Sequence, residues 1–78
     1  MVCRVGITTD LAARKSYWKR KFPRTFRNWQ VVATFHSKSH AQAYENILAN
    51  SWGCQSAPGG GRVERAVWYV YYFEHGTR

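Results

Sequence analysis

Acidic residues are scarce in this 78-residue chain, which has four Asp and Glu against twelve Lys and Arg and a formal net charge of +8. Such an excess of positive charge is typical of proteins that contact nucleic acid, although it carries no information about the fold. The expected partner is nucleic acid, DNA in preference to RNA. A protein partner or a second copy of the chain remains an alternative.

Long apolar runs are also missing. No run approaches the roughly 18–20 residues of a membrane span, and the first residues lack the apolar core of a signal peptide. We therefore expect a cytoplasmic protein without membrane association. The two cysteines, Cys3 and Cys54, do not form the dense pattern of a secreted disulfide-rich domain. Two partly buried thiols are the favoured interpretation, and a disulfide between the first strand and a loop is the alternative.

The length allows one domain, residues 1–78. A chain this short buries only about 60% of its unfolded surface, so its core needs large side chains. Four Trp, five Tyr and four Phe supply them, because one buried aromatic ring removes roughly 150–250 Å² from water.

The first half of the chain predicts a strand and a basic helix. Met1–Thr8 is rich in β-branched residues and ends at a polar cluster, so it predicts a strand. Thr9 or Asp10 can cap a helix that begins near Leu11, and Pro23 ends this helix at or before Phe22.

The second half predicts two strands and one helix. A basic loop at 24–28 precedes a strand at Trp29–Phe35 and a helix from about His40 to Asn50. Residues 55–62 predict a flexible loop, because Pro followed by three Gly continues no regular element. Val67–Phe73 is apolar on both faces, which indicates a strand covered on two sides.

These elements predict an α+β fold in the order β-α-β-α-β. Its sheet has three strands, antiparallel or mixed, and the C-terminal strand is central so that each helix crosses over without a knot.

Two segments carry recognisable motifs. The segment Arg4–Arg14 places a glycine, Gly6, at the end of a strand and an arginine eight residues later in a helix. The segment Ala41–Leu48 places Glu45 in a helix, four residues after an alanine. Both segments resemble the GIY-YIG nuclease superfamily, in which a Tyr-x-Gly strand precedes the catalytic Arg and a later helix carries the metal-binding Glu.

The chain departs from the family pattern in its first motif strand. Arg4 replaces the tyrosine of Tyr-x-Gly, and no Gly-Ile-Tyr strand precedes it. The C-terminal segment Val70–Phe73 resembles that strand, with Tyr69 in place of its glycine. We therefore expect a circular permutant, which requires Val2 and Phe73 to lie on adjacent antiparallel strands.

The resemblance implies a catalytic set of Arg14, Glu45 and Tyr71. Glu45 would bind Mg²⁺ or Mn²⁺, Arg14 would bind the charge that develops on the phosphoryl group, and Tyr71 would position or deprotonate the attacking water. Each residue also has a simpler interpretation. Arg14 can neutralise phosphate, Glu45 can be a helix-surface acid, and Tyr71 can belong to the core.

Seven cations between residues 14 and 27 form the predicted nucleic-acid contact, and no acid interrupts them: Arg14, Lys15, Lys19, Arg20, Lys21, Arg24 and Arg27. The neighbouring rings either stack on bases or hold the helix on the core. We expect a small basic domain that binds nucleic acid, with metal-dependent phosphodiester hydrolysis if the motif residues are active. A non-catalytic binding module and a small protein-interaction adaptor are the alternatives.

Overall fold

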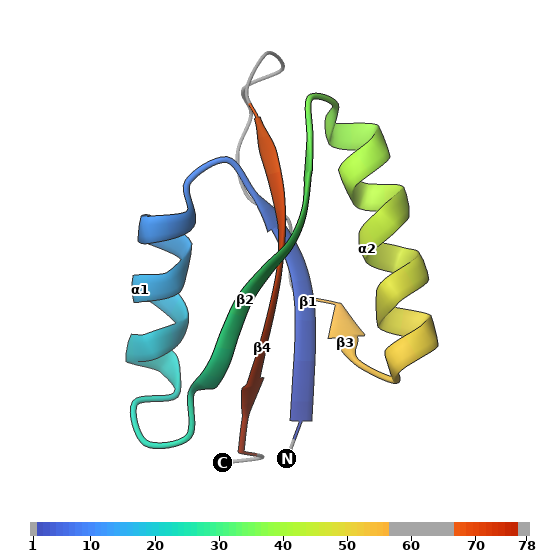
Figure 1. Ribbon diagram of the computed structural model, residues 1–78. Coiled ribbons are helices and arrows are strands. Elements are labelled where there is room, and N and C mark those ends of the chain that lie inside the picture. Colours follow the sequence, from blue (N-terminus) through green and yellow to red (C-terminus); the bar gives the residue numbers. More distant parts are fainter. Residues whose placement is uncertain (1, 57–66, 77–78) are drawn as a thin grey trace.

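The computed structural model describes residues 2–56 and 67–76, which form two helices and a four-stranded sheet (Figure 1). The elements in chain order are β1 (Val2–Thr8), α1 (Leu11–Lys21), β2 (Arg27–Phe35), α2 (Lys38–Trp52), β3 (Gln55–Ser56) and β4 (Trp68–His75). The α+β class is confirmed. The three-stranded sheet and the order β-α-β-α-β were wrong, because the predicted loop at 55–62 begins with the short strand β3. The rest of that loop lies outside the described residues.

Side-chain and backbone caps set the ends of the helices. Helix α1 begins where the Asp10 carboxylate accepts a hydrogen bond from the amide of Ala13, and it ends just before Pro23. Helix α2 begins after Ser37 and ends at Gly53, whose φ of 67° is the left-handed conformation that favours glycine. Neither helix of the described part of the chain is long and apolar enough to cross a membrane.

The sheet has the strand order β2-β4-β1-β3, so the C-terminal strand β4 is interior. It runs antiparallel to both neighbours, whereas β3 pairs parallel with β1. Val2 lies opposite His75 and Arg4 lies opposite Phe73. The predicted adjacency of Val2 and Phe73 on antiparallel strands is therefore confirmed.

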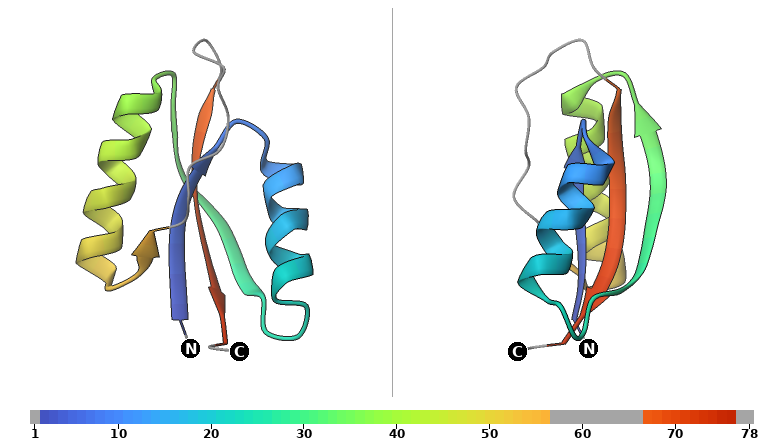
Figure 2. Two further views of the ribbon diagram at one scale, coloured as in Figure 1. Left: turned by 180° about the vertical axis from the view of Figure 1, so that it is seen from behind. Right: turned by 90° about the vertical axis from the view of Figure 1, so that its left-hand side faces the viewer.

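The two helices cover opposite faces of the sheet (Figures 1 and 2). Successive side chains of a strand point to opposite faces, and β4 supplies buried residues to both. Trp68 and Val70 pack in a cluster with the alanines of α2, and Tyr71 and Phe73 pack in a second cluster with Trp18 of α1. The aromatic residues therefore fill both layers of this small core.

Cys3 and Cys54 form a disulfide, so the interpretation as free thiols was wrong. The reason is the pairing of β3 with β1. Arg4 lies opposite Gln55, and the residues that directly precede this pair, Cys3 and Cys54, have Cα atoms 4.8 Å apart. Disulfides are typical of oxidising compartments. The cytoplasmic location stays a prediction, and this bond does not support it.

Candidate nucleic-acid interface

The predicted cations gather on the solvent side of α1, on the loop that follows it and at Arg27, the first residue of β2. Trp18 points into the core and is only 1% exposed, so the cationic positions of the helix turn outward. Three of them stand in the last turn, where positive charge interacts favourably with the helix dipole. Arg14 is half-buried, and the other six are exposed: Lys15, Lys19, Arg20, Lys21, Arg24 and Arg27. We call these seven residues the basic surface.

The carboxylates that the structure describes accept their hydrogen bonds from other groups. Asp10 caps α1. Glu45 accepts from Gln42 and Ser56, and Glu74 accepts from the side chains of Asn28 and Tyr72. None of these bonds comes from a lysine or an arginine. The basic surface therefore presents concentrated positive charge to solvent.

The rings interleaved with the basic surface belong mainly to the core. Trp18 is buried with Tyr71 and Phe73, and three partly buried rings pack against them: Phe22, Phe26 and Trp29. The base-stacking interpretation is thus left to Tyr17, which is 39% exposed. The guanidinium carbon of Arg14 lies 5.4 Å from its ring centroid, a distance typical of cation–π contact.

A hollow of about 370 Å³ opens where β1 ends and α1 begins. Arg14 and Arg20 line it together with the ring of Tyr17 and the polar residues at the turn: Thr8, Thr9 and Asp10. Two guanidinium groups and the Thr9 hydroxyl offer donors to a phosphate, whereas the Thr8 hydroxyl already donates to the carbonyl oxygen of Asp10. The Asp10 carboxylate at the same hollow opposes an anion, although its side chain already caps the helix.

Tyr71 is fully buried beneath α1, and its hydroxyl accepts a hydrogen bond of 3.0 Å from Trp18 Nε1. Burial raises the pKa of the phenol above its ordinary value of 10.0; the Trp18 hydrogen bond and the charge of Arg14 lower it, and Glu45 raises it. The raised pKa keeps the phenol neutral. A buried neutral phenol is poorly suited to deprotonate water, so this geometry favours the core interpretation.

Glu45 lies on α2, which covers the opposite face of the sheet from α1 (Figure 1). It is 1% exposed, so the interpretation as a helix-surface acid was wrong. Its Oε1 accepts from Gln42 Nε2 at 3.0 Å, and its Oε2 accepts from the hydroxyl of Ser56 at 2.9 Å. The Ser56 bond ties α2 to the edge strand β3.

The surroundings of Glu45 do not fit a bound Mg²⁺ or Mn²⁺. A magnesium ion held by one carboxylate keeps several waters and needs open space for substrate oxygens. Glu45 is buried and both of its oxygens already accept hydrogen bonds. Within residues 2–56 and 67–76, no group of three or more His, Cys, Asp or Glu side chains could hold a metal ion.

The predicted catalytic residues are thus divided between two faces. Arg14 and Tyr71 lie on the α1 face, whereas Glu45 lies on the α2 face. Both charges still act on the phenol, because Arg14 lowers the pKa of Tyr71 and Glu45 raises it. Each of the three side chains nevertheless contacts its own partners: Tyr17 for Arg14, Trp18 for Tyr71, and Gln42 with Ser56 for Glu45.

No family model, curated protein or solved structure matches this chain. The likeness to GIY-YIG nucleases rests on the motif residues themselves.

Arg4 is a further cation on the α1 face, although the sequence motif identifies it only as the residue that stands in place of a tyrosine. Its Nε donates to Nε2 of His75 at 2.9 Å, and its guanidinium carbon lies 5.2 Å from the ring centroid of Trp18. Strand alternation could have identified it, because Arg4 and Gly6 share one face of β1. Arg4 adds half-buried positive charge beside the basic surface.

Proposed function

We propose that this chain is a small nucleic-acid-binding domain that contacts phosphates through its basic surface. The observation that carries the proposal is the exposure of six neighbouring cations while the described carboxylates bond elsewhere. Like charges held this close repel one another, and a polyanion relieves that repulsion.

DNA is the proposed nucleic acid, which follows from the resemblance to GIY-YIG nucleases. The antiparallel pairing of β1 with β4 supports that resemblance, since a permuted family hairpin requires it. The motif glycine Gly6 lies opposite Tyr71 in this pairing. These two observations favour a permuted and degenerate member of the GIY-YIG superfamily that has kept its binding surface and lost its catalytic residues.

The salt dependence of binding tests the proposal. If four to six of the cations neutralise phosphates, the logarithm of the affinity should fall with the logarithm of salt with a slope of roughly −4 to −5 on duplex DNA. Fluorescence anisotropy of labelled duplex and single-stranded DNA, and of RNA of the same sequence, measures this slope.

The matched variants are Lys19→Ala/Arg20→Ala and Lys38→Ala. The first removes two cations of the basic surface and should reduce the slope by about 2, whereas the exposed Lys38 lies on α2 and its loss should leave the slope unchanged. Equal slopes for both variants, or a wild-type slope near zero, would contradict the proposal.

Metal-dependent phosphodiester hydrolysis is the second candidate. The hollow that contains Arg14 and Arg20 favours it, because two guanidinium groups there could hold a scissile phosphate. Incubation of plasmid and branched DNA with Mn²⁺ tests it, with Arg14→Ala and Glu45→Ala as variants. Cleavage by the wild type that Arg14→Ala loses, with an unchanged circular-dichroism spectrum, would establish hydrolysis. Absence of cleavage by both the oxidised and the reduced protein leaves a binding domain.

An adaptor function has less support. The large apolar side chains exposed among the described residues are scattered over α1, β2 and α2, and the two on α2 are five positions apart: Tyr17, Val31, Ile47 and Trp52. Sedimentation velocity at several concentrations would detect the self-association that an adaptor pairing with a second copy requires.

A further inference from the structure

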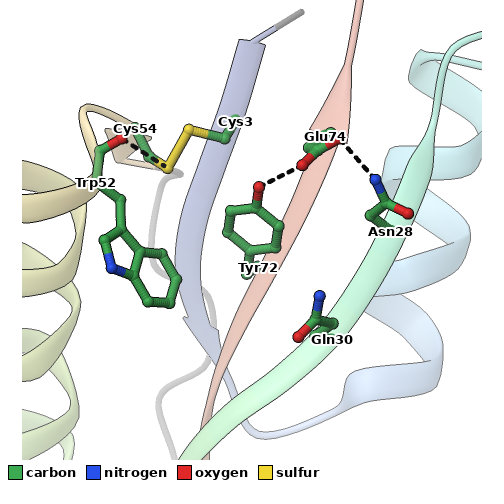
Figure 3. A pocket seen from close by; sticks show the side chains of 7 residues that line it. All are labelled: Cys3, Asn28, Gln30, Trp52, Cys54, Tyr72 and Glu74. Atoms are coloured by element: carbon green, nitrogen blue, oxygen red, sulfur yellow. Dashed lines mark hydrogen bonds between the residues drawn. A yellow bond between two sulfur atoms is a disulfide. The ribbon is translucent and has the colours of Figure 1, made fainter.

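A second hollow, of about 320 Å³, opens on the α2 face of the sheet, away from α1 (Figure 3). One wall is the end of α2 with Trp52 and the Cys3–Cys54 disulfide. The floor and the other wall come from β4 and the start of β2, with Tyr72, Glu74, Asn28 and Gln30. Its volume lies at the lower end of the range for small-ligand sites.

Trp52 gives this hollow an aromatic wall. Its side chain is 50% exposed, which is unusual for the largest apolar side chain, and it meets Tyr72 edge-on with ring centroids 5.5 Å apart. Figure 3 shows both rings at the same opening. An exposed indole beside a hollow offers a stacking surface for a flat ring.

Glu74 gives the hollow a fixed acceptor. Its Oε1 accepts from Asn28 Nδ2 at 2.7 Å and its Oε2 accepts from the Tyr72 hydroxyl at 2.5 Å (Figure 3). The Tyr72 hydrogen bond, followed by that of Asn28, lowers the pKa of Glu74, so the carboxylate stays charged. A carboxylate has about four acceptor positions, so each oxygen keeps one for a ligand.

These groups define the chemistry of the ligand. It has a flat ring that stacks on Trp52, and it carries two adjacent N–H donors that match the two oxygens of Glu74. Phosphate is excluded from direct contact, because the carboxylate repels it. Among the common bases, guanine has this edge, with its ring N–H next to its amino group. Uracil and thymine place carbonyl oxygens on both sides of a single N–H, and adenine and cytosine place a ring acceptor beside the amino group.

We propose that this hollow binds one unpaired guanine, stacked on Trp52 and bonded to Glu74. This inference rests on the proposed function and names the part of the nucleic acid that enters the α2 face. Arg27 connects the two sites, because it belongs to the basic surface and lies opposite Glu74 in the pairing of β2 with β4. A phosphate on Arg27 would leave the attached base within reach of the hollow.

Uncharged nucleosides test the inference without phosphate contacts. In amide-correlation NMR of ¹⁵N-labelled protein, guanosine should shift the indole N–H of Trp52 and the side-chain amides of Asn28 and Gln30. Inosine lacks only the amino group and should bind roughly fivefold more weakly or worse, because one of two paired hydrogen bonds is lost. Uridine should bind more weakly still.

Three variants complete the experiment. Trp52→Ala should weaken guanosine roughly fivefold or more through lost stacking, and Glu74→Gln should abolish the preference for guanosine over inosine. Ile47→Ala, at a 61% exposed position of the same helix, should change neither. Each spectrum also reports whether the variant is folded.

The outcomes separate this inference from the proposed function. Guanosine that binds no better than inosine or uridine overturns the inference, as do shifts confined to α1. Equal shifts with a methyl glycoside would identify a carbohydrate site and also overturn it. If the nucleosides fail while salt-dependent DNA binding by the basic surface persists, only this inference fails. Guanosine binding without salt-dependent DNA binding would instead remove the proposed function.

Discussion

Replacement of Tyr71 by Phe separates a structural tyrosine from a catalytic one. The substitution keeps the ring and removes only the hydroxyl that accepts from Trp18 Nε1. Trp18 is 1% exposed and Tyr71 is fully buried, so water cannot reach the indole N–H that loses its acceptor. The variant therefore leaves one buried donor unsatisfied in the α1 cluster.

The expected cost follows from that unsatisfied donor. A buried polar group without a partner costs about 1–3 kcal/mol. The free energy of unfolding of a typical domain is about 5–15 kcal/mol, so a loss of about 2 kcal/mol is a large part of it. For a domain of this size, about 2 kcal/mol lowers the melting temperature by roughly 8–16 °C. DNA affinity should stay unchanged, because the hydroxyl is buried and its hydrogen bond is with Trp18.

Urea denaturation followed by far-ultraviolet circular dichroism, with the disulfide intact, measures this cost. Tyr17→Phe is the matched control, because the Tyr17 ring is 39% exposed and the loss of its hydroxyl should change the unfolding free energy by less than about 0.5 kcal/mol. A Tyr71→Phe variant as stable as the control would refute the structural role. A stable variant that had lost DNA cleavage would show that the hydroxyl acts in catalysis.

Three further changes test other parts of the fold. Reduction of Cys3–Cys54, which closes a loop with a sequence separation of 51, should lower the unfolding free energy by about 2–4 kcal/mol in urea titrations with and without reductant. Gly53→Ala should cost about 1 kcal/mol, because a Cβ at φ 67° meets no atom within 4 Å but strains the left-handed backbone; a loss above about 3 kcal/mol would indicate a clash. The Glu74 hydrogen bond, with burial second, raises the pKa of Tyr72 from 10.0 to about 12, so this stabilisation is complete below pH 10 and is lost as pH rises through 12. The stability difference between wild type and Tyr72→Phe should therefore shrink over that range, and a constant difference would contradict the assignment.

The sequence predicted those features that local signals determine. Pro23 marks the end of α1, because proline has no N–H with which to continue a helix. The apolar residues on both faces of β4 predicted its interior position, because a strand buries the side chains of both faces only when both faces are covered. The cations of the basic surface could also be identified from the sequence, because they lie close together between residues 14 and 27.

The features that the sequence did not predict depend on contacts between distant residues. Strand β3 has two residues and no periodicity of its own, and it exists through pairing with β1. The burial of Glu45 follows from a tertiary contact with Ser56. Its neighbours Ala41 and Ala49, four residues away on either side, are the other buried residues of α2 and mark the face that packs on the sheet.

The contacts of Glu45 also link the disulfide to any hydrolytic activity. For the carboxylate to meet a metal or a substrate, Ser56 and the rest of β3 would have to move off it. The disulfide opposes that motion, because Cys54 directly precedes β3 and is bonded to Cys3 of β1. The oxidised chain therefore holds its acid as a structural group, whereas reduction would leave, among the described contacts, the pairing of β3 with β1 and the Ser56 hydrogen bond to hold β3 in place. A cleavage assay is decisive only when it is run in both redox states: activity confined to the reduced protein would make Glu45 an acid that the disulfide keeps covered, and inactivity in both would leave it a purely structural link between α2 and β3.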